Sequence, residues 1–300
     1  PDTVEEWYTY LKAVKEGDPN GNGVNDEIPY AGIGLGSLKN LQKAFGIREG
    51  ALFYLQDGTI ACAVEQAAYK DWLTTMKAWY EEGLIDPEIL STTRADLDAK
   101  VLSDKAGSLW SGAGTGQLGL YLKQKDTAGD TTFSLYPVRN PLTAQGERLA
   151  TYKTTYGTGA AITTACKNVV EAVKLLDYCY SEEGRRLAYL GVEGVCYTAK
   201  EDGGIEFTDY VTNNPDGLTF DAALIQNGAA PWDFPGVQFP EYWAQNTSFY
   251  PQQQVAYDQW SQVTVDKELP PIRFTKDEAS DVASLMNDIN TLLNETLANI

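Results

Sequence analysis

The sequence contains no histidine, and this absence excludes several kinds of chemistry together. Ser-His-Asp and Cys-His catalysis, imidazole-bound zinc and general bases that titrate near neutral pH all need that side chain. The four cysteines, Cys62, Cys166, Cys179 and Cys196, form no C-x-x-C pair, so neither a zinc site nor a thioredoxin-type site is expected. Buried thiols and one or two disulfides both stay open; buried thiols are favoured because free cysteine is among the most buried residue types.

Long apolar runs and excess positive charge are also missing. No run of about 18 apolar residues occurs, so no transmembrane helix is predicted. The 42 acidic and 23 basic side chains give a net charge of −19, a field that repels phosphate backbones and anionic lipid and so argues against both as partners. The chain opens with PDTVEEW and lacks an initiating methionine. We therefore expect a fragment, whose missing signal peptide says nothing about the parent protein.

The 300 residues, 43% of them hydrophobic, suffice for a large core and two domains or lobes. Helical and strand patterns alternate, which is typical of an α/β architecture. Capping boxes and apolar periodicity predict helices over residues 3–17, 68–83 and 167–191 and from Thr275 onward. Short strands are predicted within residues 28–34, 106–112, 131–138 and 158–163. The tryptophans that recur on helix faces are predicted to be core: Trp7, Trp72 and Trp79.

The polar stretch GDPNGNGVNDEIP, residues 17–29, packs three acids, three asparagines and three glycines into 13 positions. Calcium binds six to eight oxygens, and the EF-hand loop supplies them from alternate positions with a glycine at position 6. This stretch matches that register at its start, but Pro29 stands where the EF-hand has its last acid. The predicted ligands of a structural Ca²⁺ ion are Asp18, Asn20, Asn22, the Val24 carbonyl, Asp26 and Glu27. A flexible Asn/Gly turn is the alternative.

Four blocks follow one another in the order in which one protein family carries them. They are TVEEWYTYLKAVKEGDPNGNGVNDEIP, YEEGLIDPEI, DKAGSLWSG and TGAAITTACKNVVEAVKLLDYCYSEEGRRLAYLGVEGVCY. This order resembles the extracellular solute-binding proteins of family 1, the carbohydrate receptors of ABC importers, and especially their lipoprotein-anchored branch in Gram-positive bacteria. The likeness covers most of residues 1–205 and fades afterwards.

The resemblance implies an α/β, periplasmic-binding-protein-like type II fold, in which two lobes joined by chain crossovers close over a sugar. It implies a substrate-binding component, not an enzyme, that captures an oligosaccharide or other carbohydrate outside the cell and delivers it to permease subunits. The full-length protein would be a monomer, anchored to the cell membrane as a lipoprotein. Family members carry a further N-terminal segment, so the first lobe is expected to be incomplete here. By the same analogy, residues 1–140 form the second lobe, 150–205 return to the first, and 206–300 cross back.

Candidate ligand residues follow from sugar chemistry, which calls for aromatic platforms beside polar side chains. Trp110, at the end of a predicted strand, matches a position where the family stacks an aromatic ring on a sugar; an ordinary core tryptophan is the alternative. Ser111 could add a hydroxyl group. The proline-broken aromatic segment 231–251 adds Trp232, Asp233, Tyr242 and Trp243, for which a buried cluster is an equally good interpretation.

Three rival functions stay open. A peptide or another solute could replace the sugar in a receptor of the same fold. A glycoside hydrolase needs two carboxylates about 5 to 9 Å apart, and the sequence offers no acid at a strand end in catalytic surroundings. A dockerin-like module would carry two short calcium repeats, whereas a single such loop is recognised here.

Overall fold

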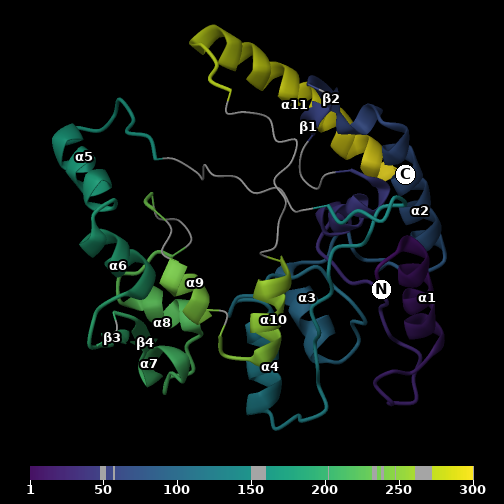
Figure 1. The fold of residues 1–300 in the computed structure, drawn as a ribbon, viewed down its shortest axis with the longest axis horizontal. Helices are drawn as coiled ribbons and strands as arrows, with labels where there is room; N and C mark the ends of the chain where they lie inside the picture. Colours follow the sequence, from purple (N-terminus) through teal and green to yellow (C-terminus); the bar gives the residue numbers. More distant parts are fainter. Residues whose placement is uncertain are drawn as a thin grey trace. The chain divides into compact units, whose positions relative to one another are not determined.

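The computed structural model describes residues 1–47, 52–56, 58–149, 160–201, 203–231, 235–237, 240–246, 248–260 and 272–299. Its elements, drawn in Figure 1, are α1 (Val4–Glu16), η1 (Leu35–Phe45), β1 (Phe53–Gln56), β2 (Thr59–Cys62), η2 (Ala63–Glu65), α2 (Ala67–Glu81), α3 (Arg94–Leu102), α4 (Leu118–Thr127), α5 (Val169–Tyr178), α6 (Glu182–Leu190), β3 (Tyr197–Ala199), β4 (Ile205–Phe207), α7 (Asp209–Thr212), α8 (Phe220–Gln226), α9 (Pro240–Asn246), α10 (Pro251–Trp260) and α11 (Lys276–Asn299).

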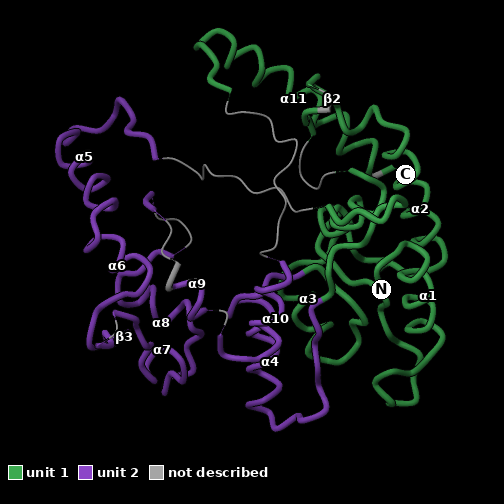
Figure 2. Tube along the Cα trace, in the orientation of Figure 1, with its two compact units in different colours: residues 1–110, 138–153, 262–300 green, residues 111–137, 154–261 purple. Residues whose placement is uncertain are grey.

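The chain divides into two compact units, coloured separately in Figure 2. Unit 1 comprises residues 1–110, 138–153 and 262–300, and unit 2 comprises residues 111–137 and 154–261. The chain therefore passes between the units repeatedly. The predicted assignment of residues 1–140, 150–205 and 206–300 to two lobes stays a prediction.

The core of unit 1 forms where the apolar faces of α1 and α2 meet. Trp7, Trp72 and Trp79 are 7%, 3% and 4% exposed, which confirms the prediction that they are core residues. Thr3 caps α1 as predicted, its hydroxyl accepting a hydrogen bond from the backbone N–H of Glu6 at 3.2 Å. The Glu6 carboxylate, however, accepts from the N–H of Asp2. The reciprocal half of the cap therefore lies one residue earlier than the capping-box rule places it.

Residues 28–31 form the central segment of a small parallel sheet in unit 1. The Tyr30 N–H donates to the Leu84 carbonyl on one side, and the Ala31 N–H donates to the Ser108 carbonyl on the other, at 3.1 and 2.8 Å. The partners along residues 106–109 and at Ile85 run parallel to it. The predicted strands in 28–34 and 106–112 thus appear as short parallel bridges.

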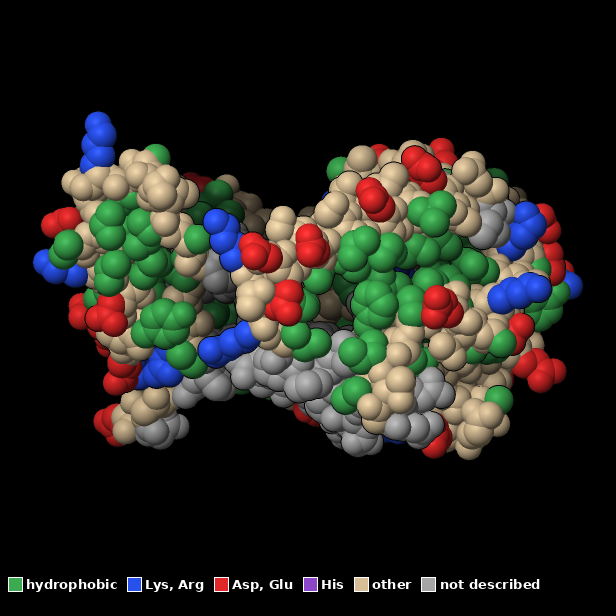
Figure 3. Space-filling view, turned by 90° about the horizontal axis from the view of Figure 1, so that it is seen from above, with side chains coloured by type: hydrophobic (Ala, Val, Ile, Leu, Met, Phe, Trp, Pro, Cys, Tyr) green, Lys and Arg blue, Asp and Glu red, His purple; other side chains and the backbone are tan. Residues whose placement is uncertain are grey.

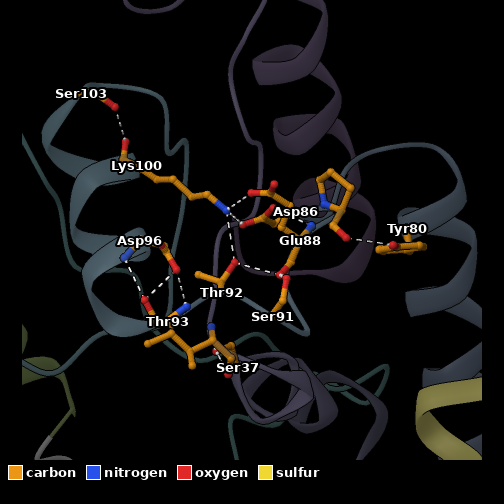
Figure 4. Close-up of polar contacts among 12 residues, drawn as sticks. Ser37, Tyr80, Asp86, Glu88, Ser91, Thr92, Thr93, Asp96, Lys100 and Ser103 are labelled. Atoms are coloured by element: carbon orange, nitrogen blue, oxygen red, sulfur yellow. Dashed lines mark hydrogen bonds and ion pairs between the residues drawn. The ribbon is translucent and has the colours of Figure 1, made fainter.

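A buried ion pair fixes the chain that follows this sheet. Figure 4 shows Lys100 reaching from α3 to Asp86, Glu88 and Thr92, with Nζ 2.8, 3.0 and 3.2 Å from their oxygens. Burial lowers the pKa of Lys100, but the hydrogen bonds to Asp86 and Glu88 outweigh it, and the net pKa is raised. The Asp86 side chain is only 1% exposed, so this lysine is the cation that offsets a buried negative charge.

Unit 2 has a core of its own around the antiparallel hairpin β3–β4 and the helices α6 to α9. Tyr189, Phe207, Phe220 and Tyr242 pack there, with the rings of Phe207 and Phe220 in an edge-to-face contact at 4.9 Å. The helices α4 and α10 lie side by side (Figure 1) and share a smaller cluster that includes Leu122.

Three secondary-structure predictions for residues 131–191 differ from the structure in the described residues. The predicted helix over 167–191 is two helices, α5 and α6, because the Ser181 hydroxyl accepts from the Gly184 N–H and starts a new helix. The predicted strand over 131–138 is irregular: the Asp130 carboxylate accepts hydrogen bonds from the backbone N–H groups of Thr132 and Phe133 and forms a turn instead. Residues 160–163, the described part of the fourth predicted strand, are also irregular.

Helix α5 leaves its apolar side chains on the surface. It has no buried residue, and Val169, Val170, Val173 and Leu175 are 49% to 64% exposed. Figure 3 shows hydrophobic side chains exposed on the face that it draws. In the described part of the chain, these four side chains are therefore left uncovered.

Helix α11 and the cysteines follow the sequence predictions in part. Thr275 and Glu278 form the predicted capping box at the start of α11, but its inward face, predicted from Val282 and Met286, is only half-buried. All four cysteines are free thiols; Cys179 and Cys196 are buried, as the favoured interpretation expects, whereas Cys62 and Cys166 are only partly buried. Within the described ranges, no helix combines the length and apolar character needed to cross a membrane.

Candidate functional site

Trp110 stands at the carboxyl end of the parallel pairing in unit 1. It directly follows Leu109, which is bridged to Ala31, and its side chain is 48% exposed. Large aromatic side chains are usually mostly buried. In open α/β sheets, ligands bind outside the carboxyl ends of the strands. This exposed ring is therefore placed where such a sheet offers a binding surface.

Ser111 begins a glycine-rich loop that is held together by Gln117. The Gln117 side-chain oxygen accepts from the Ser111 hydroxyl at 3.3 Å and from the Gly112 N–H. The Leu118 N–H, at the start of α4, donates to the Gly112 carbonyl at 3.2 Å. The Ser111 hydroxyl is thus oriented, but its hydrogen bond is already made to Gln117 inside the loop.

The other predicted ligand residues lie in the aromatic segment of unit 2. Tyr242 is fully buried; its hydroxyl donates to Asp221 at 3.4 Å and accepts from the Asn246 side chain at 3.2 Å. Burial, reinforced by the charge of Asp221, raises the pKa of Tyr242, so the phenol stays neutral. Trp232, Asp233 and the side chain of Trp243 lie outside the described residues. Their contacts with a ligand stay predictions.

Unit 2 also contains a cavity of about 850 Å³. Its walls come from α4, from residues 212–220 and from residues 249–253, with Phe249 and Tyr250 among the aromatic side chains. None of the predicted ligand residues that the structure describes lines it. No local pattern in the sequence marks it, because its three walls are far apart along the chain.

The predicted cation loop folds around the carboxylate of Asp18. Its two oxygens accept from the backbone N–H groups of Asn22 and Gly23 at 3.0 and 2.8 Å, and the Asn22 amide oxygen accepts from the Val24 N–H at 2.6 Å. Gly21 and Gly23 have φ of +69° and +79°, the left-handed region that favours glycine. The side chains at the first loop positions are therefore turned inward by the backbone itself.

The two acids at the end of the loop have very different surroundings. Asp26 pairs with Lys105 at 2.6 Å, and hydrogen bonds from Lys105 and Asn22 lower its pKa. Both carboxylate oxygens of Glu27 are buried and have no hydrogen-bond partner. A buried carboxylate without a partner is costly. This orphaned group fits a site that is completed by a cation, since a cation would satisfy both oxygens.

The described residues nevertheless hold no cluster of three or more His, Cys, Asp or Glu side chains suited to a metal ion. In the predicted set, three of the six donors are amide or backbone oxygens, which calcium accepts readily. The structure alone therefore does not confirm Ca²⁺ in this loop.

Comparison with known proteins decides the family. The family model of the bacterial extracellular solute-binding proteins matches residues 1–186. The chain belongs to this family. Its members and the solved neighbours are binding proteins rather than enzymes.

Individual relatives agree with this result. The chain is 29% identical to lipoprotein LipO of Bacillus subtilis over 240 residues, which are 75% of this chain and 46% of LipO. It aligns with the alginate-binding protein AlgQ2, solved without calcium, at a TM-score of 0.71 and 25% identity, covering 97% of this chain and 60% of AlgQ2.

The substrate-binding protein FusA of Streptococcus pneumoniae, a fructooligosaccharide transporter component, is 38% identical over 93 residues, or 29% of this chain and 17% of FusA. Its complex with kestose gives a TM-score of 0.70 at 21% identity, covering 100% of this chain and 61% of FusA, and an EF-hand mutant of FusA is also solved. The fold is thus the α/β, periplasmic-binding-protein-like fold. The chain spans about half the length of LipO.

Proposed function

We propose that this chain is part of the substrate-binding component of an ABC importer and captures an oligosaccharide outside the cell for delivery to permease subunits. Binding without turnover is part of the proposal, as are a monomeric state and a lipid anchor on the full-length protein. The relatives support this assignment, since AlgQ2 binds alginate and FusA was solved with kestose.

The observation that carries the proposal is the exposed ring of Trp110 at the carboxyl end of the parallel sheet. A half-exposed tryptophan offers a flat apolar face against which the C–H face of a sugar can stack. Ser111 and the glycine-rich loop after it, which belong to unit 2, are proposed to bring hydroxyl and backbone N–H groups to the ligand. Trp232, Asp233 and Trp243 are proposed as a second group of ligand contacts, whereas Tyr242, fully buried in the core of unit 2, is not.

A structural Ca²⁺ ion in the loop is the second part of the proposal. Asp18, Asn20, Asn22, the Val24 carbonyl, Asp26 and Glu27 would hold it, and the EF-hand of FusA supports the idea. Calcium would neutralise the buried Glu27 carboxylate and would compete with Lys105 for Asp26. The ion would stiffen the link between α1 and the central segment of the sheet.

A retention screen tests the function. The protein is incubated, with excess calcium, in a pool that contains kestose, alginate oligosaccharides, other oligosaccharides and short peptides, and mass spectrometry identifies what stays with it. We expect an oligosaccharide to be retained, and retention to fall at least tenfold in Trp110→Ala but not in Tyr180→Ala, a control at a ring that is 62% exposed. Retention of peptides instead would favour the alternative of a peptide receptor. Retention of an oligosaccharide equally by both variants would refute the role of Trp110.

A further inference from the structure

Two buried side-chain amides hold the loop that follows Trp110 in the chain. Asn246, at the end of α9, and Gln253, in α10, are both fully buried. Their partners lie in the loop of residues 111–119, about 130 residues earlier in the sequence. Neither residue is among the predicted ligand residues.

Asn246 binds the middle of the loop through both ends of its amide. Its oxygen accepts from the Thr115 N–H at 3.1 Å, and its nitrogen donates to the Thr115 hydroxyl at 2.9 Å. The same nitrogen donates to the Tyr242 hydroxyl at 3.2 Å. These contacts fix the position of Thr115 in two directions.

Gln253 holds the loop at Ala113, two residues nearer to Ser111 in the sequence. Its nitrogen donates to the Ala113 carbonyl at 2.8 Å and to the Asn246 carbonyl at 3.2 Å, and its oxygen accepts from the Tyr250 N–H at 3.2 Å. The two amides therefore form one connected network. A buried network whose members are all satisfied is rigid, and breaking it leaves unpaired polar groups.

Glycines in the loop are what allow this close approach. A Cβ atom on Gly114 would lie 2.7 Å from the Asn246 Oδ1 atom, and one on Gly119 would lie 2.6 Å from the Gln253 Nε2 atom. Such distances essentially never occur for real Cβ atoms. The glycines and the two amides thus fit each other, although they come from distant parts of the chain.

We propose that Asn246 and Gln253 are positioning residues of the ligand site, which hold residues 111–119, and with them the Ser111 hydroxyl, in a single conformation. Neither touches the ligand in this account; they act through the loop. The consequence for ligand binding rests on the proposed function, whereas the effect on the loop does not.

Amide hydrogen exchange, read by mass spectrometry on the full chain, tests the positioning without any ligand. Asn246→Ala is expected to speed exchange of the amides in residues 111–119 about tenfold or more. Thr115→Val removes a single hydroxyl partner and is a milder second variant, which keeps the test valid if Asn246→Ala fails to fold. Gly114→Ala keeps both amides but displaces the loop, and is expected to act in the same direction.

Asn214→Ala is the matched control. Asn214 is a buried amide of the same unit, 9% exposed, whose oxygen accepts from the Asp216 N–H at 2.9 Å rather than from residues 111–119. We expect it to speed exchange near residues 214–218 and to leave the 111–119 amides unchanged. Unchanged exchange of residues 111–119 in folded Thr115→Val and Gly114→Ala would overturn the proposal, as would an equal increase in Asn214→Ala.

Retention of oligosaccharides from the same pool separates this inference from the proposed function. Faster exchange of the 111–119 amides together with at least tenfold weaker oligosaccharide retention supports the proposed positioning role. Both are measured at a temperature where the variant stays folded. A loosened loop with retention unchanged would overturn the role in binding. A wild-type chain that retains no oligosaccharide would overturn the proposed function, while the exchange data would still decide whether the amides fix the loop.

Discussion

Glu27→Gln should change the free energy of unfolding in opposite directions with and without calcium. In chelator, the substitution replaces a buried carboxylate that has no partner by a neutral amide. Leaving a buried polar group unsatisfied costs about 1–3 kcal/mol, and more for a charged group. The variant is therefore expected to be more stable than the wild type by about 1 kcal/mol or more when calcium is absent.

With calcium present, the order should reverse. A ligand that binds only the folded state at 100 times its Kd stabilises it by about 2.7 kcal/mol. The wild type should gain this amount, and the variant should lose most of it because a neutral amide is a weaker calcium ligand than a carboxylate. The net difference then favours the wild type by about 1–2 kcal/mol.

Urea unfolding measured by tryptophan fluorescence suits this test, because Trp7, Trp72 and Trp79 all report on the core of unit 1. Glu16→Gln is the control: the Glu16 side chain is 67% exposed and lies 3.8 Å from Lys12, so a change within about 0.5 kcal/mol is expected in both conditions. The account of the loop is refuted if calcium stabilises Glu27→Gln as much as the wild type, or stabilises neither protein.

Three further predictions concern stability and the state of the cysteines. Lys100→Ala leaves the buried Asp86 carboxylate without its cation and should lower the free energy of unfolding by about 3–5 kcal/mol. Lys12→Ala is the control: Lys12 pairs with Glu16 on the surface, so its removal should leave the free energy of unfolding nearly unchanged in the same urea titration. Hydrogen bonds, first that from Thr132, hold the pKa of Asp130 below its usual value. The ionised Asp130 therefore adds to the free energy of unfolding above the unfolded-state pKa of about 4, and this addition is lost as the pH falls through the folded-state pKa. Between pH 6 and pH 2, the urea concentration at the unfolding midpoint should therefore fall less steeply in Asp130→Asn than in the wild type. An equally steep fall in both proteins would contradict this. Thiol labelling of the denatured, unreduced protein should modify all four cysteines; two or fewer labels would reveal disulfides instead.

Local patterns in the sequence predicted those elements whose causes are local. The apolar spacing of Trp72, Met76 and Trp79 gave a correct helix and a correct core face. The capping residues at Thr3 and Thr275 marked helix starts correctly, since a cap depends only on the next turn.

Failures arose where a single side chain competes with a longer pattern, or where partners are far apart. Apolar periodicity continues across Ser181, so it could not reveal that this hydroxyl starts a new helix. The alternation after Asp130 resembled a strand, but the aspartate binds the backbone that a strand would need. Asn246 and Gln253 lie in a segment with no distinctive motif, and their importance depends on contacts with residues 113 and 115 that only the fold creates.

The most direct test of the receptor account is the mass of the glycan that the protein binds. The protein is saturated with calcium and incubated with kestose and the other oligosaccharides of the pool, and the bound and free fractions are recovered after prolonged incubation. The account predicts bound glycans of unchanged mass and a free pool that stays intact. Shortened glycans in either fraction would contradict it and identify a hydrolase.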